Sequence, residues 1–295
     1  LKKKNFRKEY FYDLKVGFSK EVYLFQILNH PKPTQMFHKN YPFYTSSSKF
    51  MIKHFKNYSK WCQKYIKRNS KIIEIGSNDG TFLKNFKKLK ENAVGFEPSK
   101  NVSDLAKKKG INSINKFFNS ESVNQIKEFH NNTDLICGAN VICHIPNIKD
   151  VFRSVKKLLS PNGVFIFEEP YLGSVFEKTS YDQIYDEHIF LFSVLSVDKI
   201  AKKFGLRLIN LLPQETHGGS MRYVITKQKN DRNVSIIVKK YLSKEKKQNL
   251  HNLRSCINFK KKCFRLKKNL REKLISFKTQ GKKVCGYAAT SKSTT

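Results

Sequence analysis

Apolar and polar positions follow two different periods along the middle of the chain. Short apolar runs bounded by turn residues predict strands at 71–75, 93–97, 111–118, 134–145, 164–170, 206–212 and 220–227. Segments in which apolar residues recur every three or four positions predict helices at 49–69, 81–90, 100–110, 147–163 and 197–205. Strands that alternate with helices are typical of parallel βαβ units. We therefore expect an α/β fold with one mainly parallel sheet covered on both faces.

The two ends of the chain lack this alternation. Residues 1–48 contain the loop signals "HPKP" and "YPFYTSSS", which predict an irregular segment. Residues 233–280 predict one long basic helix with an apolar stripe, and "KKVCGYAATSKSTT" begins like a further strand. We expect three parts: an N-terminal segment at 1–48, an α/β domain at 49–228 and a C-terminal part at 229–295.

Composition limits the class of protein. With 295 residues and 39% hydrophobic content the chain can build one large domain or two modest ones. No apolar run approaches the ~20 residues needed to cross a bilayer, and residues 1–15 are too charged for a signal peptide. We expect a soluble, cytoplasmic protein with no membrane partner. The six cysteines show no C-x-x-C spacing, which indicates free thiols and no metal site.

The net charge of +35 has two interpretations. It could be a nucleic-acid footprint, or a solvated lysine surface without such a partner. Most of the basic residues are lysine, whereas base recognition favours the planar, bidentate arginine side chain. We favour the solvated surface and consider a nucleic-acid partner unlikely. Such a surface would still attract a phosphorylated substrate.

The stretch "EIGSNDG" follows the first predicted strand and has its glycines at 76 and 80, so it lacks the G-x-G-x-x-G of dinucleotide binders. Glu97 ends the second strand about 20 residues later, where an acidic residue can accept both hydroxyls of a ribose. Glu74 and Asp79 would repel a pyrophosphate and attract a sulfonium, which favours S-adenosylmethionine over an ordinary turn that happens to carry acids. The residues expected at this cofactor are Glu74, Gly76, Ser77, Asn78, Asp79, Gly80, Glu97, Pro98 and Asn140.

The stretch "YDQIYDEHIF" (181–190) collects proton-handling groups after the fifth strand, above the same crevice. Methyl transfer to carbon needs a base, and His188 suits that role because the ordinary imidazole pKa of ~6.5 is close to neutral pH. Glu187 could hold the imidazole. Tyr185 could donate a hydrogen bond to an enolate oxygen, and Tyr181 could position the substrate. His144, at the end of the fourth strand, faces the same crevice.

A third stretch, "HGGSMR", adds candidates on the substrate side. It supplies an imidazole, a tight turn, a hydroxyl and a guanidinium through His217, Gly218, Ser220 and Arg222. A histidine in a loop is commonly a surface or structural residue, and the position after the fifth strand is what favours His188 as a base. Surface or structural roles are expected for the remaining histidines, His30, His38, His54, His130 and His251.

Together these motifs resemble one family, the sugar C-methyltransferases that act on nucleotide-linked keto-deoxysugars. The resemblance runs through "EIGSNDGTFLKNF", "GANVICHIPN", "YDQIYDEHIFLFS", "HGGSMRYVI" and "GYAATSK", of which Y-D-x-I-Y-x-E-H-x-x-x-x-S and H-G-G-S-x-R are the most specific. It implies a Rossmann-like class I methyltransferase with a mainly parallel seven-stranded sheet. It further implies that His188 removes the proton beside a ketone, that Tyr185, Glu187 and His144 assist, and that Tyr41 lies on the substrate side. The methyl acceptor would be C-3 of a 4-keto sugar.

Three features depart from the family pattern. Ser19 and Val22 stand where the last cysteines of a four-cysteine zinc module are usual, so we expect no zinc and treat residues 1–48 as a remnant of that module. Asp186 stands where the family often has histidine. The family's C-terminal lobe starts at "GYAATSK" and is otherwise missing, so the chain resembles a form truncated at both ends, with Tyr287 and Lys292 as remnants of the nucleotide-sugar site.

Two other functions stay open at this point. The same fold could methylate an oxygen or nitrogen of another small molecule, for which a base is less essential. The chain could also be a basic nucleic-acid-binding protein with a degenerate methyltransferase fold, although the intact acidic and glycine positions of the cofactor turn argue against such decay. The sequence leaves monomer and dimer equally open.

Overall fold

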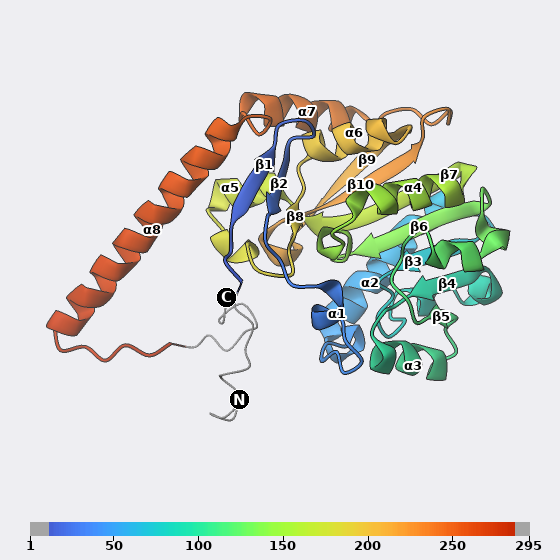
Figure 1. The fold of residues 1–295 in the computed structure, drawn as a ribbon, viewed down its shortest axis with the longest axis horizontal. Coiled ribbons are helices and arrows are strands. Elements are labelled where there is room, and N and C mark those ends of the chain that lie inside the picture. Colours follow the sequence, from blue (N-terminus) through green and yellow to red (C-terminus); the bar gives the residue numbers. More distant parts are fainter. Residues whose placement is uncertain (1–11, 287–295) are drawn as a thin grey trace.

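The computed structural model describes residues 12–286, and its body is a seven-stranded sheet (Figure 1). The strands are β3 (Ile72–Ile75), β4 (Ala93–Phe96), β5 (Ser113–Ile114), β6 (Thr133–Ala139), β7 (Leu159–Pro170), β9 (Leu206–Gln214) and β10 (Ser220–Lys227). They lie in the order β5-β4-β3-β6-β7-β10-β9. All pairs from β5 to β7 are parallel, and β10 runs antiparallel between β7 and β9. The expected Rossmann-like sheet of a class I methyltransferase is confirmed.

Both faces of this sheet are buried, because successive strand residues point to opposite sides. Ile72 joins an apolar cluster with α2 (Lys49–Cys62) on one face. Ile73 joins a second cluster with α4 (Ile148–Leu158) and α6 (Val194–Lys203) on the other. The continuous apolar runs of the strands follow from this two-sided burial.

The helices predicted at 49–69, 100–110 and 197–205 agree with the structure, and the helix predicted at 81–90 is absent. The helix predicted at 147–163 ends at Leu158, since β7 begins at Leu159. Ser48 caps α2 by accepting a hydrogen bond from the backbone N–H of Met51, and α3 spans Lys100–Lys108. In place of the helix at 81–90 there are two 3₁₀ segments, Leu83–Asn85 and Lys87–Asn92. The side-chain amide of Asn85 donates to the carbonyls of Thr81 and Phe82, both at 3.0 Å. These local bonds compete with the backbone bonds of an α-helix.

Within residues 12–48 the N-terminal segment contains strands and short helices, so the prediction of an irregular segment is wrong for this part. Strands β1 (Val16–Ser19) and β2 (Leu24–Ile27) form a hairpin, and β2 also pairs with β8 (Phe190–Leu191) in a separate three-stranded sheet. A short helix α1 (Pro33–Met36) and a 3₁₀ turn (Thr45–Ser47) follow. Phe25 of β2 packs with α5 (Leu172–Lys178) in a third apolar cluster. The hairpin therefore attaches this segment to the chain around β8.

The predicted helix at 233–280 consists of two helices, α7 (Ile236–Lys247) and α8 (Leu253–Thr279). Asn249 separates them in a left-handed conformation with φ 58°, and Asn252 caps α8 by accepting from the backbone N–H of Arg254. Figure 1 shows α8 leading away from the body. Apolar side chains on this helix are exposed, and Phe264 has 60% of its surface accessible. Residues 282–286 form no strand, and Tyr287 and Lys292 lie outside the described residues.

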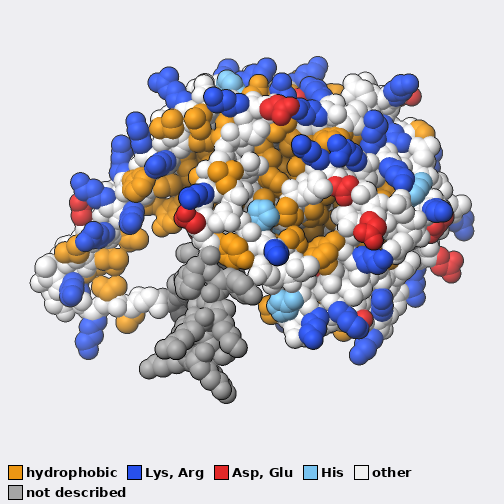
Figure 2. Space-filling view, in the orientation of Figure 1, with side chains coloured by type: hydrophobic (Ala, Val, Ile, Leu, Met, Phe, Trp, Pro, Cys, Tyr) orange, Lys and Arg blue, Asp and Glu red, His pale blue; other side chains and the backbone are white. Residues whose placement is uncertain are grey.

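The helices, cysteines and surface charges of the described residues bear on the expectations from composition. None of the helices between residues 12 and 286 combines the length and apolarity that a bilayer crossing requires. All six cysteines are free, which confirms the prediction of unpaired thiols. Figure 2 shows Lys and Arg side chains scattered over the visible face without forming one stripe.

Candidate active site

A cavity of about 820 Å³ opens where the carboxyl ends of β3, β4 and β6 meet. Parallel strands direct their following loops to this edge, which is where ligands bind in such folds. The predicted residues that line the cavity are Tyr41, Glu74, Gly76, Ser77, Asn78, Glu97, Pro98, Asn140, His144 and His217. The structure thus brings together most of the expected cofactor positions, two of the residues expected at the substrate and His144, which was expected to assist catalysis.

Gly76 begins the turn after β3 in a left-handed conformation, with φ 65°. A Cβ atom at this position would lie 2.5 Å from Cγ2 of Val141, so only glycine fits without displacing the next loop. Asn78 follows, and its side chain accepts from the backbone N–H of Thr45 (2.8 Å) and donates to the carbonyl of Phe43 (3.2 Å). Asn78 therefore anchors the N-terminal segment beside the cavity.

Glu97 is fixed by backbone donors. Its Oε2 accepts from the N–H of Asn78 at 3.1 Å, and its Oε1 accepts from the N–H of Ser99 at 2.7 Å. Burial raises the pKa of Glu97, although these hydrogen bonds partly offset that effect. A buried carboxylate oriented in this way is suited to accept hydrogen bonds from two ribose hydroxyls.

Glu74 and Asn140 carry buried oxygens that lack a donor. Oε2 of Glu74 and Oδ1 of Asn140 have no hydrogen-bond partner within the described chain. Burial raises the pKa of Glu74 strongly, and the negative charges of Cys137, Asp79 and Glu97 raise it further. A cationic amino or sulfonium group would relieve both features, since it supplies positive charge to this carboxyl-rich pocket. The site therefore fits S-adenosylmethionine.

Asp79 and Gly80 do not line the cavity, which corrects two of the expected cofactor contacts. The carboxylate of Asp79 is fully buried and lies 2.9 Å from Nζ of Lys109, and it also accepts from the hydroxyl of Thr81 at 2.7 Å. Gly80 has φ 76°, and a Cβ there would lie 2.6 Å from Cγ1 of Ile111. Both residues shape the turn from behind. The charge of Asp79 is already neutralised.

His188 is buried behind the cavity, with 3% of its surface exposed. Its Nδ1 lies 3.0 Å from the carbonyl oxygen of Gln183, and its Nε2 lies 2.8 Å from the hydroxyl of Tyr185. A carbonyl only accepts, so the proton of the neutral ring is assigned to Nδ1 and the Nε2 lone pair accepts from Tyr185. This arrangement fixes both the tautomer and the orientation of the imidazole.

His144 connects His188 with the cavity. The centroids of the two imidazole rings are 5.3 Å apart, and His144 lines the cavity while stacking on Phe37 at 5.8 Å. Burial, together with the nearby charge of His217, lowers the pKa of His144 to about 4. His144 is therefore neutral at physiological pH.

Tyr41 lies between the cofactor side and the decapeptide. Burial raises the pKa of its hydroxyl, and the charges of Glu187 and Glu97 raise it further. Burial also raises the pKa of Glu187, with a contribution from Asp186. The pKa of Tyr185 is raised chiefly by burial. Both phenols are thus protonated at neutral pH and can act as hydrogen-bond donors.

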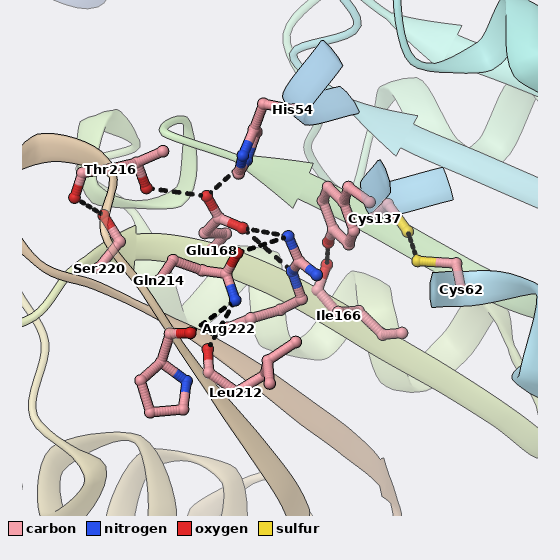
Figure 3. A network of polar contacts seen from close by, with 12 residues as sticks. His54, Cys62, Cys137, Ile166, Glu168, Leu212, Gln214, Thr216, Ser220 and Arg222 are labelled. Atoms are coloured by element: carbon pink, nitrogen blue, oxygen red, sulfur yellow. Dashed lines mark hydrogen bonds and ion pairs between the residues drawn. The ribbon is translucent and has the colours of Figure 1, made fainter. Parts of the chain in front are cut away.

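Arg222 lies inside the protein and does not face the cavity, which corrects its expected role (Figure 3). Its Nη2 lies 2.6 Å from Oε2 of Glu168, and its guanidinium lies 3.9 Å from the ring centroid of Tyr58. Oε1 of Glu168 lies 2.8 Å from Nε2 of His54 and accepts from the hydroxyl of Thr216 at 3.2 Å. Arg222 therefore holds the base of the loop that carries His217.

The other substrate-side residues are also distributed differently than expected. Ser220 is buried and donates its hydroxyl hydrogen bond to the carbonyl of Thr216 at 3.0 Å. Gly218, with φ 76°, shapes the turn. Tyr181 is 47% exposed and lines a second hollow beside β1 and α8. Of this group, His217 alone lines the main cavity.

Sequence reasoning missed several residues at the site. Phe37 and Phe43 come from the segment that was expected to be irregular, and they carry no catalytic signal. Glu168 was missed because its partners Arg222 and His54 are far away in the chain. The pairing of β7 with β10 places Glu168 directly opposite Arg222. The run of two glutamates at the end of a buried strand was the one available signal.

Comparisons with known proteins agree with this geometry. A family model for a methyltransferase domain matches residues 49–211, and one for a C-methyltransferase C-terminal domain matches residues 215–295. C-methyltransferase NovU of Streptomyces niveus is 30% identical over 221 residues, which cover 75% of this chain and 53% of that protein. The chain therefore spans about half the length of this curated relative.

Solved structures include similar methyltransferases. A possible histamine N-methyltransferase of Thermotoga maritima is 17% identical, with a TM-score of 0.45, over 61% of this chain and 92% of that chain. The magnesium protoporphyrin IX methyltransferase of Synechocystis with bound S-adenosylmethionine is 10% identical, with a TM-score of 0.43, over 60% of this chain and 79% of that chain.

Proposed function

The chain belongs to the S-adenosylmethionine-dependent C-methyltransferase family, and we propose that it methylates the carbon beside the ketone of a nucleotide-linked deoxysugar. The substrate class rests on the resemblance of the motifs at 181–193 and 217–222 to the sugar enzymes. The basic surface is compatible with a diphosphate-bearing substrate. Acceptor C-3 of a 4-keto sugar is part of the same proposal.

The cofactor would be held by the turn after β3 and by the end of β4. Glu97 would accept the ribose hydroxyls, and Glu74 and Asn140 would face the cationic amino-acid end with their unpartnered oxygens. Gly76 lets the backbone approach the ligand closely. When bound, the cofactor supplies a methyl group activated by its sulfonium.

His188 would act as the base. The hydrogen bond from Nδ1 to the Gln183 carbonyl leaves the lone pair on Nε2, and this is the observation that carries the proposal. Nε2 accepts the proton from the carbon beside the ketone, and the resulting electron pair forms an enolate. Tyr185, which is protonated at neutral pH, can then donate from its hydroxyl to the enolate oxygen.

The residues around His188 favour the charged imidazolium that results from proton abstraction. Glu187 directly precedes His188 in sequence and supplies a carboxylate on the same loop. His144 is neutral, so it adds no positive charge beside the protonated ring. Phe37 stacks on His144 and shields this side from water. Tyr41 can bind a substrate oxygen from the opposite wall.

Solvent exchange at the substrate carbon tests the base directly. In deuterium oxide with S-adenosylhomocysteine bound, the wild-type chain should exchange the proton beside the ketone of a nucleotide-linked 4-keto sugar. His188→Asn should abolish this exchange while calorimetry shows unchanged binding of S-adenosylhomocysteine. His130→Asn, at the opposite edge of the sheet before β6, is the matched control and should exchange normally. Exchange that persists in His188→Asn would exclude the proposed mechanism.

A further inference from the structure

Three metal-ligating side chains lie together beside the cavity, and one of them, His144, lines it. One ligand atom from each of Cys143, His144 and His188 lies within 4.8 Å of the other two, and all three residues are buried. Cys143 and His144 belong to the 3₁₀ segment Ile142–His144, and His188 comes from the loop before β8. The proposed methyl transfer uses the imidazoles and has no role for the thiol.

The set matches the ligand preference of zinc. Zn²⁺ binds thiolate and imidazole ligands in tetrahedral coordination, with metal–ligand distances of about 2.0–2.3 Å, and a set of three protein ligands leaves the fourth position to water. Such ligands lie about 3.3–3.6 Å apart, so closure of the trio needs movements of about 1 Å. Nε2 of His144 is buried and lacks a hydrogen-bond partner in the described part of the chain. This unpartnered nitrogen is an independent sign that the site suits a ligand.

The surroundings of the trio resemble the outer shell of a metal site. Nδ1 of His188 is hydrogen-bonded to a backbone carbonyl, an interaction that orients metal-bound imidazoles. Glu169 accepts from the backbone N–H groups of Val141 (3.0 Å) and Ile142 (2.7 Å) through Oε1, and it is hydrogen-bonded to the Cys143 thiol. A thiolate and this carboxylate together would balance the charge of a divalent ion.

We propose that Cys143, His144 and His188 form a binding site for Zn²⁺, and that occupation of this site inhibits the enzyme. The inhibitory part rests on the proposed function, because the metal would take the Nε2 lone pair with which His188 accepts the substrate proton. Binding replaces the bond from the Tyr185 hydroxyl to Nε2 and releases the thiol proton of Cys143 to solvent. The ion would enter through the cavity that His144 lines.

Cobalt substitution tests metal binding without reference to activity. The full chain carrying Cys285→Ala, which removes an exposed thiol, is titrated with Co²⁺. We expect one equivalent to produce a thiolate-to-cobalt charge-transfer band and the intense visible bands of tetrahedral coordination, and Zn²⁺ to displace it. A protein that stays folded and shows no such band would overturn the proposal.

Variants locate the site. In the same background Cys143→Ala should lose the charge-transfer band, and His144→Asn should weaken binding by at least about tenfold. Cys137→Ala is the matched control, because Cys137 is equally buried but belongs to the apolar cluster on the other face of the sheet. A charge-transfer band that survives in Cys143→Ala would place the metal elsewhere and contradict the assignment.

Turnover separates the two parts of the proposal. Zn²⁺ should inhibit the wild-type enzyme, and Cys143→Ala should need at least about tenfold more Zn²⁺ for the same fractional inhibition of its own metal-free rate. Inhibition that is equal in both proteins would overturn the inhibitory role. If the chain shows no C-methylation, the cobalt spectrum still decides the metal site, so failure of the proposed function is distinguishable.

Discussion

Glu168 and Glu169 are neighbours at the end of β7 whose side chains point to opposite faces of the sheet. Burial alone would raise the pKa of Glu168, but the hydrogen bond from His54 and the charge of Arg222 outweigh it and lower that pKa. Burial raises the pKa of Glu169 to about 7, despite backbone hydrogen bonds from Val141 and Ile142. One face therefore holds a structural ion pair. The other holds a carboxyl group that is hydrogen-bonded to the thiol of Cys143.

The ion pair of Glu168 predicts how stability depends on pH. Its pKa in the folded protein lies below the ordinary value of 4.5, so its contribution is complete above about pH 4.5 and is lost as the pH falls through the lowered pKa. Glu168→Gln should reduce the free energy of unfolding by about 3 kcal/mol or more at pH 7, because it leaves the charge of Arg222 buried and unpaired. Urea denaturation between pH 3.5 and 7 measures this loss, which should shrink towards the acid end.

Glu215→Gln is the control for this experiment, since Glu215 is exposed near the same loop. It should change the free energy of unfolding by less than about 0.5 kcal/mol at every pH. A Glu168→Gln deficit that stays constant across the pH range would show that the charge of Glu168 is not what stabilises the fold.

Cofactor affinity should depend on the charge of Glu97. Both carboxylate oxygens of Glu97 accept from backbone N–H groups, those of Asn78 and Ser99. Glu97→Gln replaces one of these oxygens with an amide NH₂, so one acceptor is lost and two hydrogen-bond donors face each other. Hydrogen bonds to charged groups contribute about 1.5–3 kcal/mol, so the dissociation constant for S-adenosylhomocysteine should rise about tenfold or more. Calorimetric titration measures it, with the exposed Glu91→Gln as control. Equal affinity of both variants would contradict the proposed ribose contact.

At the scale of elements, the sequence predicted those strands and helices that a local pattern of apolar residues determines. Every strand of the main sheet was found, because a strand buried on both faces reads as a continuous apolar run. The helix predicted at 81–90 failed because Asn85 satisfies backbone carbonyls locally, and the long C-terminal helix was interrupted by Asn249. The hairpin β1–β2 was missed because its partner β8 lies far away in the chain. A strand of only four residues gives too short a pattern to be recognised until that partner is known.

At the site, too, residues placed by local pattern could be predicted, and residues placed by partners far away in the chain could not. Residues that follow buried strands, such as Glu74 and Asn140, could be predicted because topology fixes where strand ends meet. Arg222 could not be placed, since its role depends on which residue β7 presents opposite it. The segment 37–45, which forms one wall of the cavity, has no periodicity. Its position depends on hydrogen bonds to Asn78 and Asn101.

This wall predicts a variant that separates substrate from cofactor. Asn101 accepts from the backbone N–H of Tyr41 (3.1 Å) and donates to its carbonyl (2.8 Å) and to the hydroxyl of Tyr44 (2.7 Å). Asn101→Ala removes all three bonds, so residues 37–45 should show faster amide hydrogen exchange. We expect kcat/KM to fall about tenfold, which corresponds to about 1.4 kcal/mol. The affinity for S-adenosylhomocysteine should change less than about threefold.

Asn124→Ala is the matched amide control, because Asn124 is exposed and does not line the cavity. It should leave both the exchange of residues 37–45 and kcat/KM unchanged. If Asn101→Ala also leaves them unchanged, the wall is not held by these bonds.

At the scale of the whole molecule, the acidic site contrasts with the basic surface. The chain carries 58 Lys and Arg against 23 Asp and Glu, yet Glu74 and Glu97 line the cavity, and Glu187 lies close enough to raise the pKa of the cavity residue Tyr41. The local carboxylates suit a cationic cofactor, and the distant lysines produce a long-range positive potential. In the proposed reaction, binding of the cofactor would therefore depend on the carboxylates at the cavity, and attraction of the diphosphate-linked substrate on the surface lysines.

Salt dependence tests this division. Charges farther apart than the Debye length, about 10 Å at 0.1 M salt, are screened, whereas buried groups are screened much less. Raising the salt from about 0.02 to 0.3 M should lower kcat/KM for the diphosphate-linked sugar several-fold, because attraction to the basic surface weakens. The affinity for S-adenosylhomocysteine, which carries no net charge at neutral pH, should change by less than about twofold. A value of kcat/KM that is constant across this range would mean that the surface lysines do not attract the substrate, and that the net charge of +35 has no part in this reaction.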